Sequence, residues 1–151
     1  MTKRDFSHRF GFLVNEVGRL YGRRFDQLAR ADLGLSRAQV RLISELARHD
    51  GERPLTQAEL ADRLDLTPMG VTSLCDRMAA AGWIARQPSP TDRRANEVTL
   101  QPPATQALDD AIAVSDRVQA VALEGLTAAE RAQLLGLLRR VHANLSEAGS
   151  R

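Results

Sequence analysis

The sequence contains few of the residues that build covalent or metal-centred chemistry. Cys75 is the single cysteine among 151 residues, so an internal disulfide cannot form. The three histidines (His8, His49 and His142) are scattered and lack the spacing of a metal site. We find no Gly-rich phosphate loop, no metal-binding triad and no Ser/His/Asp set. The sequence therefore argues against an enzyme and predicts no catalytic residue, no metal site and no cofactor.

Long apolar runs are absent as well. No stretch approaches the roughly 20 apolar residues that a membrane-spanning helix needs. The first ten residues, MTKRDFSHRF, are basic, but no apolar segment follows them, which is unlike a secretory signal peptide. The sequence therefore predicts a cytoplasmic protein that does not contact a membrane.

An excess of charge of one sign is also missing. The net charge is only +2, and residues 36–101 hold nine arginines and nine acidic residues, which cancel. Residues 1–35 carry an excess of three positive charges, a pattern more typical of a solvated helix face than of a nucleic-acid patch. Any DNA-binding function must therefore rest on the geometry of particular residues and not on total charge.

Apolar residues recur at helical spacing at both ends of the chain. Residues 6–30 form one amphipathic pattern. A second pattern follows Ser36, which with Gln39 three positions on is a predicted helix cap, and this pattern ends near Asp50-Gly51. Pro102-Pro103 opens a C-terminal helix, and a capping pattern at Thr127-Ala128-Ala129-Glu130 opens the last one. The apolar stripe predicted for the first of these two helices consists of Leu108, Ile112, Ser115, Val118 and Ala122.

The middle of the chain has the pattern of two short helices followed by a β-hairpin. A capping box at Thr56-Gln57-Ala58-Glu59 starts a short helix, and Thr67-Pro68 starts a second one that runs to about Ala81. Residues 83–87 and 96–100 are predicted strands on either side of a polar loop. Two short helices and a hairpin in this order predict a winged helix-turn-helix.

Together these patterns predict a mainly α fold with a small β-hairpin wing, folded as a single domain over residues 1–151. Residues 36–101 are expected to form the winged helix-turn-helix lobe, with dimerisation helices supplied by residues 1–35 and 102–151. Long helices with apolar stripes at both ends can bury those stripes in a two-fold interface. A homodimer would then place two recognition helices roughly 34 Å apart, which suits successive major grooves.

The helix predicted after Thr67 has the two faces that a recognition helix needs. Val71, Leu74, Cys75 and Met78 recur at the spacing of a core face. The opposite face is small and polar near its start, so it can enter a major groove about 12 Å wide and reach base edges. The candidate DNA-binding residues on this helix are Thr67, Pro68, Met69, Thr72, Ser73 and Arg77.

The loop between the two strands carries Asp92, Arg93 and Arg94. Adjacent arginines on a projecting loop can enter a narrow minor groove, where the electrostatic potential is most negative. Asp92 can hold one of the two guanidinium groups in a bidentate pair. Arg93 and Arg94 are therefore candidate DNA-binding residues, and Asp92 is the candidate wing support.

The run from Leu55 to Leu100 resembles the MarR family of bacterial regulators. The likeness rests on the helix pair, on the passage DRM…AAGWI.R from Asp76 to Arg86, and on the wing DRR before a strand that ends in leucine. The flanking helices match in order, so the resemblance covers nearly the whole chain. Gln101-Pro102-Pro103 departs from the family, which often has a threonine and then a charged residue there, so the start of the following helix is expected to differ.

The resemblance implies an obligate homodimer that recognises pseudo-palindromic double-stranded DNA, usually as a repressor. It also makes Asp92 and Arg94 the wing pair, with Arg94 the better candidate for the minor groove. Many relatives lose DNA affinity when a small aromatic or phenolic acid binds between the dimer helices and the reading lobe. A small anionic aromatic effector is therefore a candidate partner, although the sequence does not identify its pocket. Residues that could meet such an anion, but more commonly form surface ion pairs, are His8, Arg9, Arg19 and Arg23.

Two alternatives remain for the central segment. A winged helix can serve as a protein–protein interaction module that never binds DNA, and the lack of net charge over residues 36–101 favours this alternative. Cys75 could sense oxidants, but its place on the predicted core face indicates a small buried side chain. The resemblance adds that oxidant-sensing relatives carry their reactive cysteine in the first helix, where this chain has none.

Overall fold

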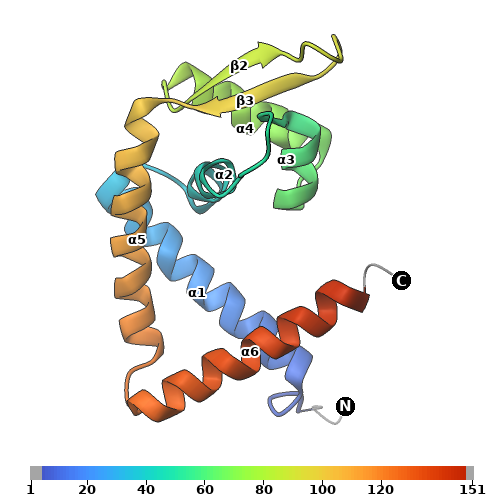
Figure 1. The fold of residues 1–151 in the computed structure, drawn as a ribbon. Coiled ribbons are helices and arrows are strands. Elements are labelled where there is room, and N and C mark those ends of the chain that lie inside the picture. The colour runs from blue at the N-terminus through green and yellow to red at the C-terminus, as the bar shows by residue number, and fades with distance from the viewer. Residues whose placement is uncertain (1–4, 149–151) are drawn as a thin grey trace, which may run out of the picture. The chain divides into compact units, whose positions relative to one another are not determined.

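The computed structural model describes residues 5–148 and is mainly helical with one small sheet (Figure 1). The chain divides into two units, Met1–Asp116 and Arg117–Arg151. Within the described residues, none of the helices combines the length and the apolarity that crossing a membrane requires.

The first unit begins with helices α1 (Phe10–Leu33) and α2 (Arg37–Ala47). The predicted start of the first helix at Phe6 is wrong, because Phe6 lies outside the helix and is 47% exposed. The capping pattern at the start of α2 is confirmed. The Ser36 hydroxyl accepts a hydrogen bond from the Gln39 amide at 3.2 Å, and the Gln39 side chain accepts one from the Ser36 amide at 2.7 Å.

The winged helix-turn-helix consists of α3 (Gln57–Leu64), α4 (Pro68–Ala80) and a three-stranded sheet. The strands β1 (Leu55–Thr56), β2 (Ile84–Pro88) and β3 (Asn96–Leu100) lie in the order β1-β3-β2, and both pairs are antiparallel. β2 and β3 are the predicted hairpin. β1 was not predicted, because a two-residue strand has too little alternation to be recognised. It pairs Leu55 with Val98 and thereby fixes the start of α3 to the wing.

The lobe is held together by a compact apolar core that α2, α3, α4 and β3 share. Its fully buried side chains include Leu42 and Ile43 from α2, Leu60 from α3, Met78 from α4 and Val98 from β3. Because every element of the helix-turn-helix contributes to this core, the core fixes the orientation of α4 with respect to the wing.

The C-terminal helices are α5 (Pro102–Ala122) and α6 (Ala128–Ala148). Of the stripe predicted for α5, Val118 is buried within the chain and Ile112 is 54% exposed. The buried face is Ala104, Ala107, Ala111, Val114 and Val118. Apolar residues therefore lie on more than one face of this helix, and hydrophobic spacing alone could not show which face is buried within the chain.

Candidate nucleic-acid interface

The turn between α3 and α4 is built by local hydrogen bonds. Asp65 adopts a left-handed conformation with φ of 54°, which short polar side chains tolerate better than others do. The Leu66 amide then donates to the Ala61 carbonyl at 2.9 Å, which closes the end of α3. The Thr67 hydroxyl accepts a hydrogen bond from the Gly70 amide at 3.0 Å, so Thr67 caps α4 as predicted. These bonds place α4 directly after α3 in a helix-turn-helix.

Helix α4 has the two predicted faces. Its buried residues are Val71, Leu74, Cys75 and Met78. The predicted contact residues are all exposed: Thr67, Pro68, Met69, Thr72, Ser73 and Arg77. Gly82, with φ of 80°, lets the chain turn sharply after the helix, and the Trp83 amide donates to the Met78 carbonyl at 3.0 Å.

A polar network that the sequence did not predict supports the exposed face of α4. Arg86 on β2 forms an ion pair with Asp76 on α4 at 2.6 Å, and the same nitrogen reaches the side-chain oxygen of Gln57 at 3.4 Å. The Gln57 amide donates to the Thr72 hydroxyl at 3.4 Å, and that hydroxyl donates to the Pro68 carbonyl at 2.9 Å. The network therefore connects β2, α3 and α4. No periodicity links these positions in the sequence, so only the fold brings them together.

The wing loop is closed mainly by hydrogen bonds to the main chain. The Ser89 amide donates to the Ala95 carbonyl at 2.8 Å, and the Ala95 amide donates to the Asp92 carbonyl at 3.0 Å. The buried Ser89 hydroxyl donates to the Glu97 carboxylate at 3.1 Å and lies 3.2 Å from the Thr91 hydroxyl. Sequence reasoning missed Ser89, since an isolated serine in a polar loop carries no recognisable signal.

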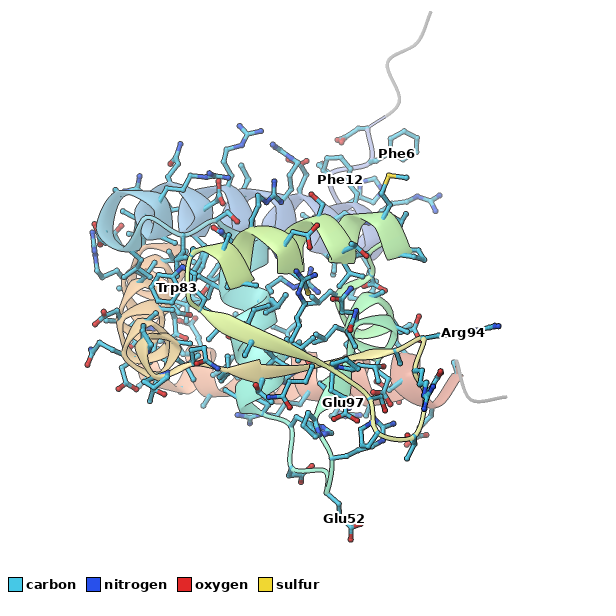
Figure 2. The ribbon with its side chains drawn as sticks, turned by 90° about the horizontal axis from the view of Figure 1, so that it is seen from above. Phe6, Phe12, Glu52, Trp83, Arg94 and Glu97 are labelled. Atoms are coloured by element: carbon cyan, nitrogen blue, oxygen red, sulfur yellow. The ribbon has the colours of Figure 1, made fainter. Side chains whose placement is uncertain are left out.

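Asp92 supports the wing by a different contact from the one expected. Its carboxylate accepts a hydrogen bond from the main-chain amide of Arg94 at 2.9 Å, whereas the expected contact was a bidentate pair with a guanidinium. This bond holds the backbone of the loop and leaves the Arg94 guanidinium to extend outward. Figure 2 shows the Arg94 side chain pointing away from the ribbon. Arg93 and Arg94 are both exposed.

Cys75 has the environment of an inert core residue. Its relative exposure is 0%, and burial raises the pKa of its thiol, while the nearby Arg86 guanidinium partly opposes that rise. A buried thiol with a raised pKa has little thiolate and reacts slowly with oxidants.

The first unit also contains a cavity of about 410 Å³ between α1, α2 and α5. Tyr21, Phe25 and Ile112 supply its aromatic and apolar walls, and Arg37 and Arg41 supply its positive charge. The Tyr21 hydroxyl lies 3.0 Å from the Ser115 hydroxyl, which joins α1 to α5 beside the cavity. Its volume falls within the range of small-molecule sites.

The arginines at the cavity differ from the residues considered as anion ligands in the sequence. Arg19 forms an ion pair with Glu16 at 2.7 Å, and Arg23 lines a second cavity with Gly22 and Asp26. His8 and Arg9 precede α1 and are exposed. Arg37 packs so closely on α1 that a side chain at Gly22 would collide with it. Sequence reasoning missed Arg37 and Arg41, because on α2 they resemble an ordinary solvated helix face.

Comparison with known proteins finds similarity to one family. The sequence profile of the MarR family matches residues 33–95, the stretch that contains α2, the helix-turn-helix and most of the wing. A protein of Thauera aromatica, named as a transcriptional regulatory protein for the hcr operon, is 29% identical over 128 residues. That match covers 83% of this chain and 74% of the relative.

Over the matched stretch, residues 33–95, the chain is similar to the MarR family. The predicted fold class is confirmed, and the predicted resemblance to the MarR family is confirmed over residues 33–95.

Solved MarR structures show the same fold. A crystal structure of MarR matches with a TM-score of 0.84 and 20% identity, over 97% of each chain. A mutant of Escherichia coli MarR in complex with operator DNA matches with a TM-score of 0.73 and 23% identity, over 91% of this chain and 99% of that one. BpsR of Bordetella bronchiseptica, whose DNA binding is regulated by 6-hydroxynicotinic acid, matches with a TM-score of 0.73 and 21% identity. That match covers 93% of this chain and 98% of BpsR.

Proposed function

We propose that this protein is a homodimeric repressor of the MarR family that binds a pseudo-palindromic operator and is released by a small anionic aromatic ligand. The observation that carries the proposal is the pairing, on one rigid lobe, of an exposed α4 face with a wing that presents Arg94 outward (Figure 2). A major-groove helix and a minor-groove arginine are complementary elements of DNA recognition.

Each contact residue has a proposed role in DNA binding. Thr67, Pro68 and Met69 lie at the start of α4, which is the part of a recognition helix that enters the major groove. Thr72, Ser73 and Arg77 continue the exposed face and are proposed to reach base edges or phosphates. Arg93 and Arg94 are proposed to contact the minor groove and its phosphates, with Asp92 holding the loop. The lobe has no net charge, so these few residues must provide its specific contacts.

Self-association accounts for apolar surface that the chain leaves exposed. Phe10, Leu13, Val17 and Leu20 follow one stripe of α1, and each is between 46% and 62% exposed. α6 buries no residue within the described chain, although Leu135, Leu137, Leu138 and Leu145 are all apolar. Surfaces of this kind mark an interface. We propose a second copy of the chain as the occupant, since a dimer supplies the two recognition helices that a pseudo-palindrome needs.

The cavity between α1, α2 and α5 is the proposed ligand site. Its aromatic wall would stack on a ring, and Arg37 and Arg41 would pair with a carboxylate. α2 also contributes Leu42 and Ile43 to the core of the DNA-reading lobe. A ligand wedged against α2 would therefore change how the lobe is held on α1 and α5. The ligand of the structurally similar BpsR, 6-hydroxynicotinic acid, is of the same chemical class.

A binding titration tests the proposal as a whole. A duplex selected by this protein from a random-sequence pool is labelled and titrated by fluorescence anisotropy at about 50 mM and 200 mM salt, beside a scrambled duplex. We expect two protomers per selected duplex and an affinity that falls by about a thousandfold or more between the two salts, because neutralised phosphates release counterions. Failure of a folded dimer to select or bind any duplex at low salt would favour the protein-interaction module instead.

The ligand is tested separately in the same assay. Benzoate and 6-hydroxynicotinic acid are added beside benzamide, which has the ring of benzoate but no charge. We expect at least one of the two acids to release DNA while benzamide does not, and we expect Arg41→Ala to abolish the effect without weakening DNA binding. The assigned site would be contradicted if the acids and benzamide released DNA equally well. It would also be contradicted if an acid still released DNA fully from the Arg41→Ala variant.

A further inference from the structure

Met69 is exposed in a way that the core of the lobe does not explain. It occupies the second residue of α4, and its relative exposure is 82%. Within residues 36–101, all of which the structure describes, it is the single large apolar side chain that is strongly exposed. The exposed stripe of α1 and the leucines of α6 belong to the dimerisation helices, so they give no reason for an apolar side chain here.

Two hydroxyl groups near Met69, those of Thr67 and Thr72, already form hydrogen bonds inside the protein. The Thr67 hydroxyl accepts from the Gly70 amide at 3.0 Å, and the Thr72 hydroxyl donates to the Pro68 carbonyl at 2.9 Å. The Gln57 side chain donates to Thr72 as well, at 3.4 Å. Pro68 has no amide hydrogen to offer. The apolar groups that the first turn of α4 exposes are therefore the Pro68 ring and the Met69 thioether.

An apolar helix start has one matching feature in the major groove. Among the four bases, thymine alone presents a methyl group there, in addition to the hydrogen-bond donors and acceptors that base edges present. A flexible, polarisable thioether adapts well to such a methyl group.

We propose that Met69 makes this helix start a thymine reader, which selects operator positions by the C5-methyl group of thymine and not by hydrogen bonds. This inference rests on the proposed DNA-binding function and specifies its chemistry. Hydrogen-bond readout is left to residues farther along the helix, such as Ser73 and Arg77, both of which are exposed.

The test removes the methyl group from the DNA and its partner from the protein. In the selected duplex, each symmetric pair of thymines is replaced in turn by deoxyuridine, which differs from thymidine only by this methyl group. Wild-type protein is compared with Met69→Gln, which has nearly the shape of methionine but a polar end, and with Met69→Leu, which stays apolar. Because Met69 is exposed, circular dichroism of all three proteins is expected to agree.

We expect one symmetric pair at which deoxyuridine weakens wild-type binding by about tenfold, since burying one methyl or methylene group contributes roughly fourfold in affinity and two half-sites contribute. Met69→Leu should keep this sensitivity, and Met69→Gln should reduce it to less than about twofold.

Three results would overturn the proposal. The first is that deoxyuridine leaves the affinity of wild-type protein unchanged at every pair. The second is that Met69→Gln loses as much affinity on deoxyuridine replacement as wild type does. The third is that Met69→Gln weakens binding to all duplexes alike, as it would if Met69 contacted protein and not DNA. A wild-type protein that selects no duplex would refute the DNA-binding function itself and the proposal with it, which distinguishes the two failures.

Discussion

Glu59 at the start of α3 allows a quantitative test of how the DNA-reading lobe is stabilised. Its carboxylate accepts two hydrogen bonds from the Arg53 guanidinium, at 2.6 Å and 3.0 Å, and one from the Thr56 amide at 2.8 Å. These bonds, first that of Arg53 and then that of the Thr56 amide, lower the pKa of Glu59 from its ordinary value of 4.5 to about 2, although burial opposes the change. The ionised carboxylate therefore stabilises the folded state.

The structure sets both a ceiling and a realistic value for this stabilisation. Since each pKa unit is worth about 1.36 kcal/mol, the ceiling is roughly 3.4 kcal/mol. The Glu59 side chain is 38% exposed and that of Arg53 is 54% exposed, so solvent screens the ion pair. We therefore expect Glu59→Gln, which keeps a capping-box side chain but loses the charge, to cost about 1 kcal/mol. Glu59→Ala loses the cap as well and should cost about 2 kcal/mol.

The pH dependence of this difference has a definite sign. The folded-state pKa of Glu59 lies below its unfolded-state value, so its contribution is fully present above about pH 4.5 and is lost as the pH falls toward 2. Urea unfolding measures the free energy of unfolding of wild type and of Glu59→Gln. The difference between the two should be constant between about pH 6 and 8 and should shrink as the pH falls from about 5 to 3. A difference that is absent at pH 7, or one that persists unchanged at pH 3, would refute the reasoning.

Three further substitutions test local parts of the lobe. In the anisotropy assay, Asp92→Ala should weaken operator binding and Asp92→Asn should not, because an asparagine side-chain oxygen can still accept the hydrogen bond from the Arg94 amide. Equal losses of affinity in the two variants would show that the charge of Asp92 matters and not the turn. Thr67→Ala should lower the free energy of unfolding by about 1 kcal/mol, since the cap on the Gly70 amide is lost; no change in urea unfolding would contradict this. Met78→Ala should cost about 2 to 5 kcal/mol by thermal unfolding, because its side chain is fully buried; a loss below about 1 kcal/mol would mean that the core collapses around the cavity.

The parts of the fold that the sequence predicted are those with a local cause. Capping boxes at Ser36 and Thr56 depend on residues three positions apart, and both are present in the structure. The core face of α4 depends on helical spacing, and Val71 and Met78 are buried as expected. For these elements a short stretch of sequence contains all the interacting groups.

The parts that the sequence did not predict depend on contacts between distant segments. β1 is defined only by its pairing with Val98, far along the chain. The face of α5 that is buried within the chain depends on which neighbour it meets, and the structure buries Ala111 there while Ile112 stays exposed. At the candidate site, the Asp76–Arg86 ion pair and the cavity arginines likewise appear only when separate elements are brought together.

The most direct test of the central claim compares two arginine substitutions in the anisotropy assay. Arg94→Ala removes the outward side chain of the wing, and Arg48→Ala removes an equal charge from the end of α2, where the side chain is 71% exposed. Both variants should keep the wild-type circular dichroism and the wild-type mass in solution. We expect Arg94→Ala to weaken selected-duplex binding by about tenfold or more, and Arg48→Ala to leave it nearly unchanged. Unchanged binding by Arg94→Ala, or equal losses from both variants, would contradict the assignment of the wing to DNA.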